Sequence, residues 1–307
     1  MSLSQTSPKP YLAWTAIALT VAIWGGYMIL ARALAREALG PVDLGLLRFA
    51  PAALLFAPVW LRFGLKPRRI RWIDALAVGV LGGFTMVSFL TLGLTYAPVA
   101  DGGIFAPSML PFFVALLSFV LLGERFSRVR LIGLALILIG ALAVGGWEAV
   151  ARSGSGTWRG HILLLCAAFA WAVYSVVFRR SGMTAIEAAA IIALYATIGF
   201  GVWAVLFGTG LDDRSWRFIA IQIVVQGVLT GFVAAYTYGF AMTRLGPSQS
   251  AAFAALVPVI TALGGLVLLD EPIGSVKGLG IAVTACGVLL ASGAIGTRQD
   301  VKPPAPA

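Results

Sequence analysis

Charged residues are scarce in this sequence. Asp, Glu, Lys and Arg together make up 11% of the 307 residues, whereas a soluble domain has about 25%. This scarcity excludes an ordinary soluble globular protein, because such a chain could not cover its surface with charge. Hydrophobic residues instead make up 60% of the sequence. The composition therefore predicts an integral membrane protein.

Histidine and cysteine are rarer still, with one histidine and two cysteines. Cys166 and Cys286 have no neighbouring His or Cys that would form a metal motif, and they fall in separate apolar runs, so we expect small buried hydrophobic residues rather than a disulfide. His161 lies near the end of an apolar run, and we expect it at the membrane interface. Because no cluster of catalytic groups falls at membrane depth, the sequence predicts neither an enzyme nor a bound cofactor or metal.

Long apolar runs are abundant. A helix needs roughly 20 residues to cross a hydrocarbon core of about 30 Å. The runs of this kind cover 12–31, 44–63, 73–94, 99–121, 129–147, 160–178, 186–207, 217–241, 247–269 and 276–296. We therefore expect an all-α integral membrane protein with ten transmembrane helices, short loops and no soluble domain.

The positive charges are distributed unevenly between the two sides of these spans. Of the 22 Lys and Arg residues, fourteen fall on the side that holds both termini, seven fall on the other side, and Arg48 lies within a span. The positive-inside rule then predicts that both termini, 1–11 and 297–307, are cytoplasmic tails in a bacterial-type inner (plasma) membrane. We attribute the net charge of +10 to contact of the basic loops with the lipid bilayer. We expect no nucleic-acid partner.

The phrase "VLLGE" at 120–124 returns as "VLLDE" at 267–271, at an interval of 147 residues. The same interval matches Trp24 with Trp171, Tyr27 with Tyr174, Arg32 with Arg179, Pro111 with Pro258, Gly133 with Gly280 and Gly140 with Gly287. Matches of this kind predict a duplicated unit of five spans, with repeats at 12–148 and 159–296. Because five is odd, the second copy would enter the membrane from the opposite face, which is a common construction of secondary transporters.

Four phrases carry a family resemblance: "AIWGGYMILARALA", "LGLLRFAPAALLF", "VLLGERFSRVRLIGLALILIGALAVG" and "VLLDEPIGSVKGLGIAVTACGVLLASG". They resemble the EamA family of the drug/metabolite transporter superfamily over about residues 12 to 296. The resemblance implies a ten-helix transporter of small molecules that works by alternating access. Within the family the chain is most similar to YddG-type exporters of aromatic and other neutral amino acids.

The prolines and small polar residues within the spans suggest a binding site. Pro107 and Pro111 each remove a backbone hydrogen bond from the fourth span, and Pro111 is matched by Pro258. We interpret the three prolines as kinks in moving cavity walls and Ser108 as a substrate contact; packing kinks are the alternative. Gln222, Gln226 and Thr230 share one face of the eighth span. Gln226 and Thr230 would line a central polar surface or would bond across helices.

Aromatic residues and one arginine complete the expected substrate site. Rings can stack on an aromatic substrate or shield its ammonium group, although packing in the core is the alternative for each ring. The candidates are Trp24, Tyr27, Tyr96, Trp171, Tyr174 and Tyr238. Arg48 would either pair with a substrate carboxylate or extend to the lipid headgroups.

The carboxylates fall near the ends of the predicted spans. Glu124 and Glu271 are expected to hold helix ends and loops, and Asp101 to start the fourth helix. With no acidic residue at mid-membrane depth, we expect facilitative export of small neutral solutes, most of all neutral amino acids, by a monomer or weak homo-oligomer. The alternatives are a broader metabolite or drug permease, and a non-transporting membrane component such as a lipid scramblase.

Overall fold

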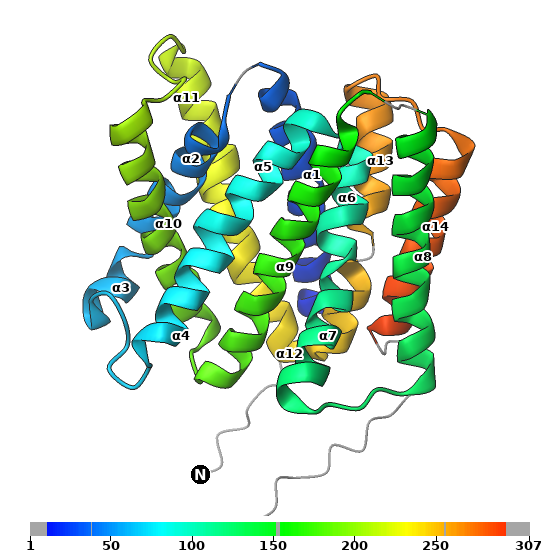
Figure 1. Cartoon of the computed structure of the whole chain (residues 1–307). Coiled ribbons are helices and arrows are strands. Elements are labelled where there is room, and N and C mark those ends of the chain that lie inside the picture. Colours follow the sequence, from blue (N-terminus) through cyan, green and yellow to red (C-terminus); the bar gives the residue numbers. More distant parts are fainter. Residues whose placement is uncertain (1–10, 38, 152–153, 255, 293–307) are drawn as a thin grey trace, which may run out of the picture.

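The computed structural model describes residues 11–37, 39–151, 154–254 and 256–292 (Figure 1). These ranges form helices and connecting turns, without a strand among them. Most of both expected tails, 1–10 and 297–307, lies outside the described residues. The all-α prediction is confirmed for the described chain. A polytopic membrane protein requires this, because a backbone in hydrocarbon must satisfy its hydrogen bonds within each segment.

Helices follow one another closely along both halves of the chain. The first half contains α1 (Tyr11–Arg36), α2 (Pro41–Leu55), α3 (Ala57–Phe63), α4 (Trp72–Leu76), η1 (Ala77–Thr85), α5 (Met86–Tyr96), α6 (Val99–Gly103), η2 (Ile104–Ser108), α7 (Leu110–Leu122) and α8 (Arg128–Ala151). The second half contains α9 (Thr157–Ser181), α10 (Ala185–Phe207), α11 (Trp216–Gln222), η3 (Ile223–Val233), α12 (Ala234–Ala254), α13 (Val257–Leu268) and α14 (Ser275–Ala291). The η segments are π-helical turns that continue the neighbouring α-helices within one span.

Seven helical stretches of described residues are long and apolar enough to cross a membrane. An eighth forms if α2 and α3, which bend by 72° at Phe56, count as one span. The remaining two expected spans correspond to the shorter apolar helices α13 and α14. The predicted spans 217–241 and 247–269 leave a loop at 242–246. That prediction is wrong, because α12 continues as a helix through these residues to Ala254.

Figure 1 shows α2, α3 and α10 at one end of the molecule and α8 and α14 at the other, with α1, α5, α6 and α9 between them. Contacts between helices agree with this order, since α2 packs on α10, α8 on α14, and α1 on both α5 and α12. The central helices α1, α5, α9 and α12 therefore surround the middle of the protein, and the two outer pairs close its ends.

Glycines allow α8 and α14 to approach closely. A Cβ atom on Gly133 would lie 2.7 Å from the carbonyl oxygen of Gly287, and one on Gly140 would lie 2.9 Å from that of Gly280. Larger residues would force the backbones apart. The order of these contacts means that the two helices run antiparallel. Because the interval of 147 residues relates Gly133 to Gly280 and Gly140 to Gly287, each helix presents matched glycines to its partner.

Two ion pairs link the halves in the same reciprocal way. Arg32 Nε lies 2.9 Å from Glu271 Oε1, and Arg179 Nη2 lies 2.7 Å from Glu124 Oε1. The two pairs are equivalent in the repeat, because Arg32 matches Arg179 and Glu124 matches Glu271 at the interval of 147 residues. Glu271 Oε2 also accepts a hydrogen bond of 2.8 Å from the backbone N–H of Val99. Each carboxylate therefore ties the end of a span in one half to the first helix of the other half.

Candidate functional site

The interface between α1 and α12 sets the depth of the candidate site. The hydroxyls of Thr20 and Thr237 are hydrogen-bonded at 2.7 Å across this interface. The two helices run in opposite directions, so the residues seven positions beyond Thr20 and seven before Thr237 lie at similar depth. Those residues are Tyr27 and Thr230, both buried. Tyr27 is 16 residues along the 26-residue α1, which places it well inside the bundle.

Arg48 faces Tyr27 from α2. Its guanidinium carbon lies 4.5 Å from the centre of the Tyr27 ring. Since α2 begins at Pro41, Arg48 lies about 10 Å along the helix, or two turns from its start. The guanidinium therefore lies over a ring that is only 4% exposed, rather than extending to headgroups.

Glycines in η3 bring that helix close to α2 beside Arg48. A Cβ atom on Gly231 would lie 2.8 Å from the carbonyl oxygen of Arg48, and one on Gly227 would lie 2.6 Å from Cβ of Pro51. Gln226, adjacent to Gly227 in sequence, is fully buried. The small residues thus allow a polar segment of η3 to pack against the helix that carries the arginine.

Several buried polar atoms on these elements have no hydrogen-bond partner within the described protein. They are Tyr27 Oη, Arg48 Nε, Ser88 Oγ, Thr91 Oγ1, Gln222 Oε1, and both Oε1 and Nε2 of Gln226. They come from α1, α2, α5, α11 and η3, and α1 and α2 each contact both α5 and η3. Buried polar groups without partners are unfavourable and uncommon. Their concentration here indicates a place for polar ligand atoms or water.

An aromatic group lies next to this polar region. Trp24 is three residues before Tyr27 and so shares its side of α1. The Trp24 ring centre lies 5.7 Å from that of Trp171 and 4.9 Å from that of Tyr238. These three rings from α1, α9 and α12 are only partly buried. Tyr174 lies one turn after Trp171 on α9 and therefore on the same side of that helix.

The structure separates other predicted site residues from this region or gives them local partners. Tyr96 is the last residue of α5 and is 45% exposed. Thr230 Oγ1 donates to the carbonyl of Val225 at 2.9 Å, so its hydroxyl already has a partner. These findings leave Trp24, Tyr27, Arg48, Trp171, Tyr174, Gln226 and Tyr238 as the predicted residues that lie around the centre.

The prolines mark breaks in matched helices. Pro107 lies in the π-helical turn η2 and has no backbone N–H to donate, and Ser108 Oγ donates to the carbonyl of Gly103 at 3.0 Å. The Ser108 hydroxyl therefore bonds within its own helix, at the turn that Pro107 interrupts. Pro111 and Pro258 are the second residues of α7 and α13, where proline is well tolerated because first-turn N–H groups have no helical partner.

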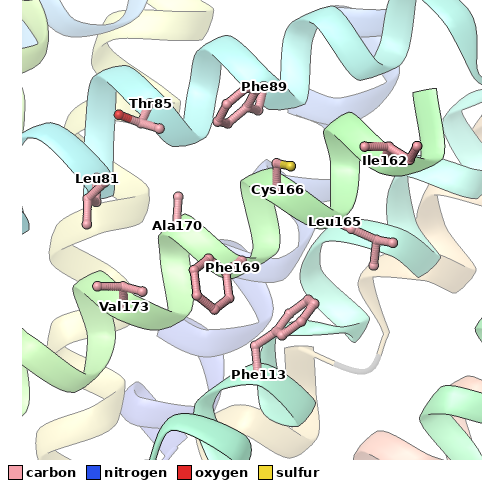
Figure 2. Close-up of a pocket in the computed structure, with 10 residues that line it drawn as sticks. All are labelled: Leu81, Thr85, Phe89, Phe113, Ile162, Leu165, Cys166, Phe169, Ala170 and Val173. Carbon is pink, nitrogen blue, oxygen red and sulfur yellow. The ribbon is translucent and has the colours of Figure 1, made fainter. Parts of the chain in front are cut away.

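A separate pocket of about 420 Å³ lies along α9. Figure 2 shows it between α9, the span formed by η1 and α5, and Phe113 of α7. Its lining residues are Leu81, Thr85, Phe89, Phe113, Ile162, Leu165, Cys166, Phe169, Ala170 and Val173. None of the predicted site residues is among them. The pocket is almost entirely apolar, so it is unsuited to a zwitterion, and we place the candidate site at the polar centre instead.

The expectation that both cysteines are buried was wrong. Cys286 is exposed and Cys166 only partly buried. His161, expected at the membrane interface, is the fifth residue of α9 and is buried, and its Nε2 lies 2.9 Å from Asp101 Oδ2. Lys277, at the start of the predicted span 276–296, is 5% exposed within α14. Sequence reasoning also missed Ser88 and Thr91, although two polar residues in an apolar span were a usable signal.

Comparisons with known proteins agree with the repeat and the helical bundle. The chain is 25% identical to an uncharacterized transporter of Archaeoglobus fulgidus, covering 85% of this chain and 91% of that one. It is 23% identical to the uncharacterized transporter YetK of Bacillus subtilis, covering 91% and 86%. It is 25% identical to a probable terminal-alkyne amino-acid exporter of Streptantibioticus cattleyicolor, covering 94% and 96%.

A solved crystal structure that is 21% identical covers 92% of this chain and 94% of its own, with a TM-score of 0.57. That likeness concerns the fold alone. The model of the EamA-like transporter family matches the chain twice, over residues 12–146 and 158–293. Both halves of the sequence thus carry the family pattern, and the chain belongs to the EamA-like transporter family, a family of multi-pass membrane transporters.

Proposed function

We propose that this transporter exports small neutral solutes, most of all aromatic and other neutral amino acids. The observation that carries the proposal is the group of buried polar atoms without partners, on Tyr27, Arg48 and Gln226, beside the rings of Trp24 and Trp171. A free amino acid supplies what this arrangement lacks: a carboxylate for Arg48, an ammonium group for acceptors and rings, and a side chain for the aromatic group.

Two features support alternating access between inverted repeats. The reciprocal ion pairs Arg32–Glu271 and Arg179–Glu124 and the antiparallel glycine contact of α8 with α14 are what two-fold related halves would produce. Ten helices in two inverted groups of five would let the halves exchange conformations and open the centre to either side in turn. We propose that the protein works as a monomer or weak homo-oligomer in a bacterial-type inner membrane.

The charge of the substrate and the ion pairs of the glutamates support facilitated exchange. A neutral amino acid carries no net charge at pH 7, so a solute gradient suffices to drive it. Glu124 and Glu271 are already ion-paired at span ends. Glu187 is likewise bound to Arg69 at 2.5 Å and caps α10 with Thr184.

The relative described as an amino-acid exporter favours amino acids over a broader range of metabolites or drugs. A lipid scramblase would need a polar groove that opens to lipid, whereas the pocket in Figure 2 is apolar.

Counterflow in liposomes tests the proposal. Purified full-length protein should exchange labelled phenylalanine for internal phenylalanine at equal pH and zero potential. Protein-free liposomes and liposomes loaded with glucose are the controls. Uptake that requires an imposed pH gradient would contradict facilitation, and failure to exchange any neutral amino acid would contradict the substrate class.

Thiol labelling tests the orientation. Cysteines introduced at 64–71 should be protected from an impermeant reagent in intact cells, and those at 154–158 should react, because the basic loop is expected in the cytoplasm. The reverse pattern would show that the chain is inserted the other way.

A further inference from the structure

Asp101, the third residue of α6, has no exposed surface and contacts basic side chains from two other helices. Its Oδ2 lies 2.9 Å from His161 Nε2, and its Oδ1 lies 2.7 Å from Lys277 Nζ. His161 is near the start of α9 and Lys277 near the start of α14. We refer to Asp101, His161 and Lys277 as the triad. It connects three helix starts at one end of the bundle, which is the outer end in the proposed orientation.

The triad is buried as a whole. The side chains of His161 and Lys277 are 8% and 6% exposed, and His161 stacks on Phe105 with ring centres 4.2 Å apart. The other charged or titratable described side chains on the packed elements at this end are Arg32 and Arg36 of α1, Tyr96 of α5, Arg159 of α9, and Asp270 and Glu271 before α14. Glu271 is ion-paired with Arg32 and Arg36, so its charge is balanced by partners outside the triad.

Protonation of His161 would change the charges that meet at Asp101. With neutral His161, Asp101 receives one neutral hydrogen bond and one ion pair. With protonated His161, both carboxylate oxygens face cations, and a charge-assisted hydrogen bond is roughly twice as strong as a neutral one. Histidine is also the side chain whose charge changes near neutral pH. A proton on His161 would therefore hold α9 more firmly to α6.

The triad has no counterpart in the other half of the chain. The interval of 147 residues relates His161 to Trp14 and Lys277 to Arg130, and it relates Asp101 to a serine. The Trp14 ring contacts the Phe253 ring in a tilted arrangement, and Arg130 lies over Phe126. A titratable contact therefore occurs at one end of a duplicated structure and not at the matched position of the other.

We propose that the triad is a proton-binding site, at which protonation of His161 tightens the contact of α9 with α6 and slows the opening of this end. The proposal rests on the alternating-access mechanism proposed above. Here the proton adjusts the rate of opening and does not drive transport, because the triad lies at a helix end and not at the substrate site.

Proton binding can be measured directly, because His161 is the only histidine. Full-length protein labelled with isotopic histidine, with any histidine tag removed, should give one set of imidazole NMR signals in proteoliposomes. These signals should shift as the pH is raised from about 5.5 to 8, the range in which histidine titrates. Signals that stay constant over this range would overturn the proposal. The measurement needs no substrate, so it remains decisive if amino-acid exchange fails.

Opening can be followed by thiol labelling. In a variant without Cys166 and Cys286, a Val99→Cys substitution places a thiol where α6 packs on α13, at a side chain with no exposed surface. An impermeant maleimide should react with it about fivefold faster at pH 8 than at pH 6, the ratio expected when a charge-assisted hydrogen bond becomes a neutral one.

His161→Gln, whose amide can still donate to Asp101, should remove this pH dependence. The matched control is Arg180→Gln, which disrupts the pair with Asp74 and should keep it. Both variants are compared with the parent after correction for the pH dependence of an exposed thiol. Equal pH dependence in the parent and in His161→Gln would overturn the proposal, even if His161 itself titrates.

Discussion

Replacing Arg48 with methionine should weaken the binding of amino acids through the loss of one specific contact. The guanidinium Nε is buried without a partner, and the group lies over the Tyr27 ring, so it is available to a substrate carboxylate. Hydrogen bonds to charged groups contribute about 1.5–3 kcal/mol. Because each 1.4 kcal/mol is a factor of ten, the half-saturating phenylalanine concentration should rise about 10- to 150-fold.

The assay is counterflow in liposomes with two substrates, phenylalanine and phenylalanine amide, which lacks the carboxylate. The pair forms a double-mutant cycle in which one change is made to the protein and one to the ligand. Arg48→Met should impair phenylalanine strongly and the amide little. Arg48→Lys keeps the charge but not the planar fork of the guanidinium, so its half-saturating phenylalanine concentration should lie between those of the parent and Arg48→Met.

Equal losses for both substrates would refute the assignment of Arg48 to the carboxylate. Such a result would mean that the arginine acts through the packing of α2 on Tyr27. Thermal unfolding of both variants in detergent is the control, because a variant that has lost its fold should lose both substrates together with its unfolding midpoint.

Two further predictions concern the moving helices and their packing. Pro111→Ala and Pro258→Ala should each let a helix continue through the break before it. Each variant should insert normally into the membrane and transport about fivefold more slowly, which corresponds to ~1 kcal/mol in the barrier. Unchanged transport rates in both variants would assign the prolines to packing alone. Gly231→Leu should destabilise the bundle by about 1–3 kcal/mol by forcing α2 from η3, measured as a lower unfolding midpoint. Gly201→Leu, where no atom lies within 4 Å of the new Cβ, should leave the midpoint unchanged.

Sequence reasoning singled out several residues whose side chains contact one another in the structure, and it missed ion-paired ones. Trp24 and Trp171 stood out because the repeat matches them, and the structure places their rings in contact. Arg48 stood out as a basic residue about one turn inside the end of its predicted span. The contact of Asp101 with His161 was not predicted, because 60 residues separate them and neither belongs to a recognisable motif.

The sequence by itself determined the class of the protein, most of its spans and its duplication. Hydropathy suffices for this, because each span must satisfy its own backbone hydrogen bonds in lipid and so reveals itself as an apolar run. Matched residues at a constant interval likewise need no structure. The depth of Tyr27 follows in part from the same information, since a helix rises by a constant amount per residue.

Only the tertiary structure decided which side chains meet across helices. Whether Arg48 turns to headgroups or to Tyr27 depends on how closely α2 approaches η3, which the glycines of η3 permit. The burial of Lys277 beside Asp101 depends on the packing of α14 against η2 and α8. Such contacts depend on helix rotation and crossing, which an apolar sequence leaves open because lipid and protein interiors are equally apolar.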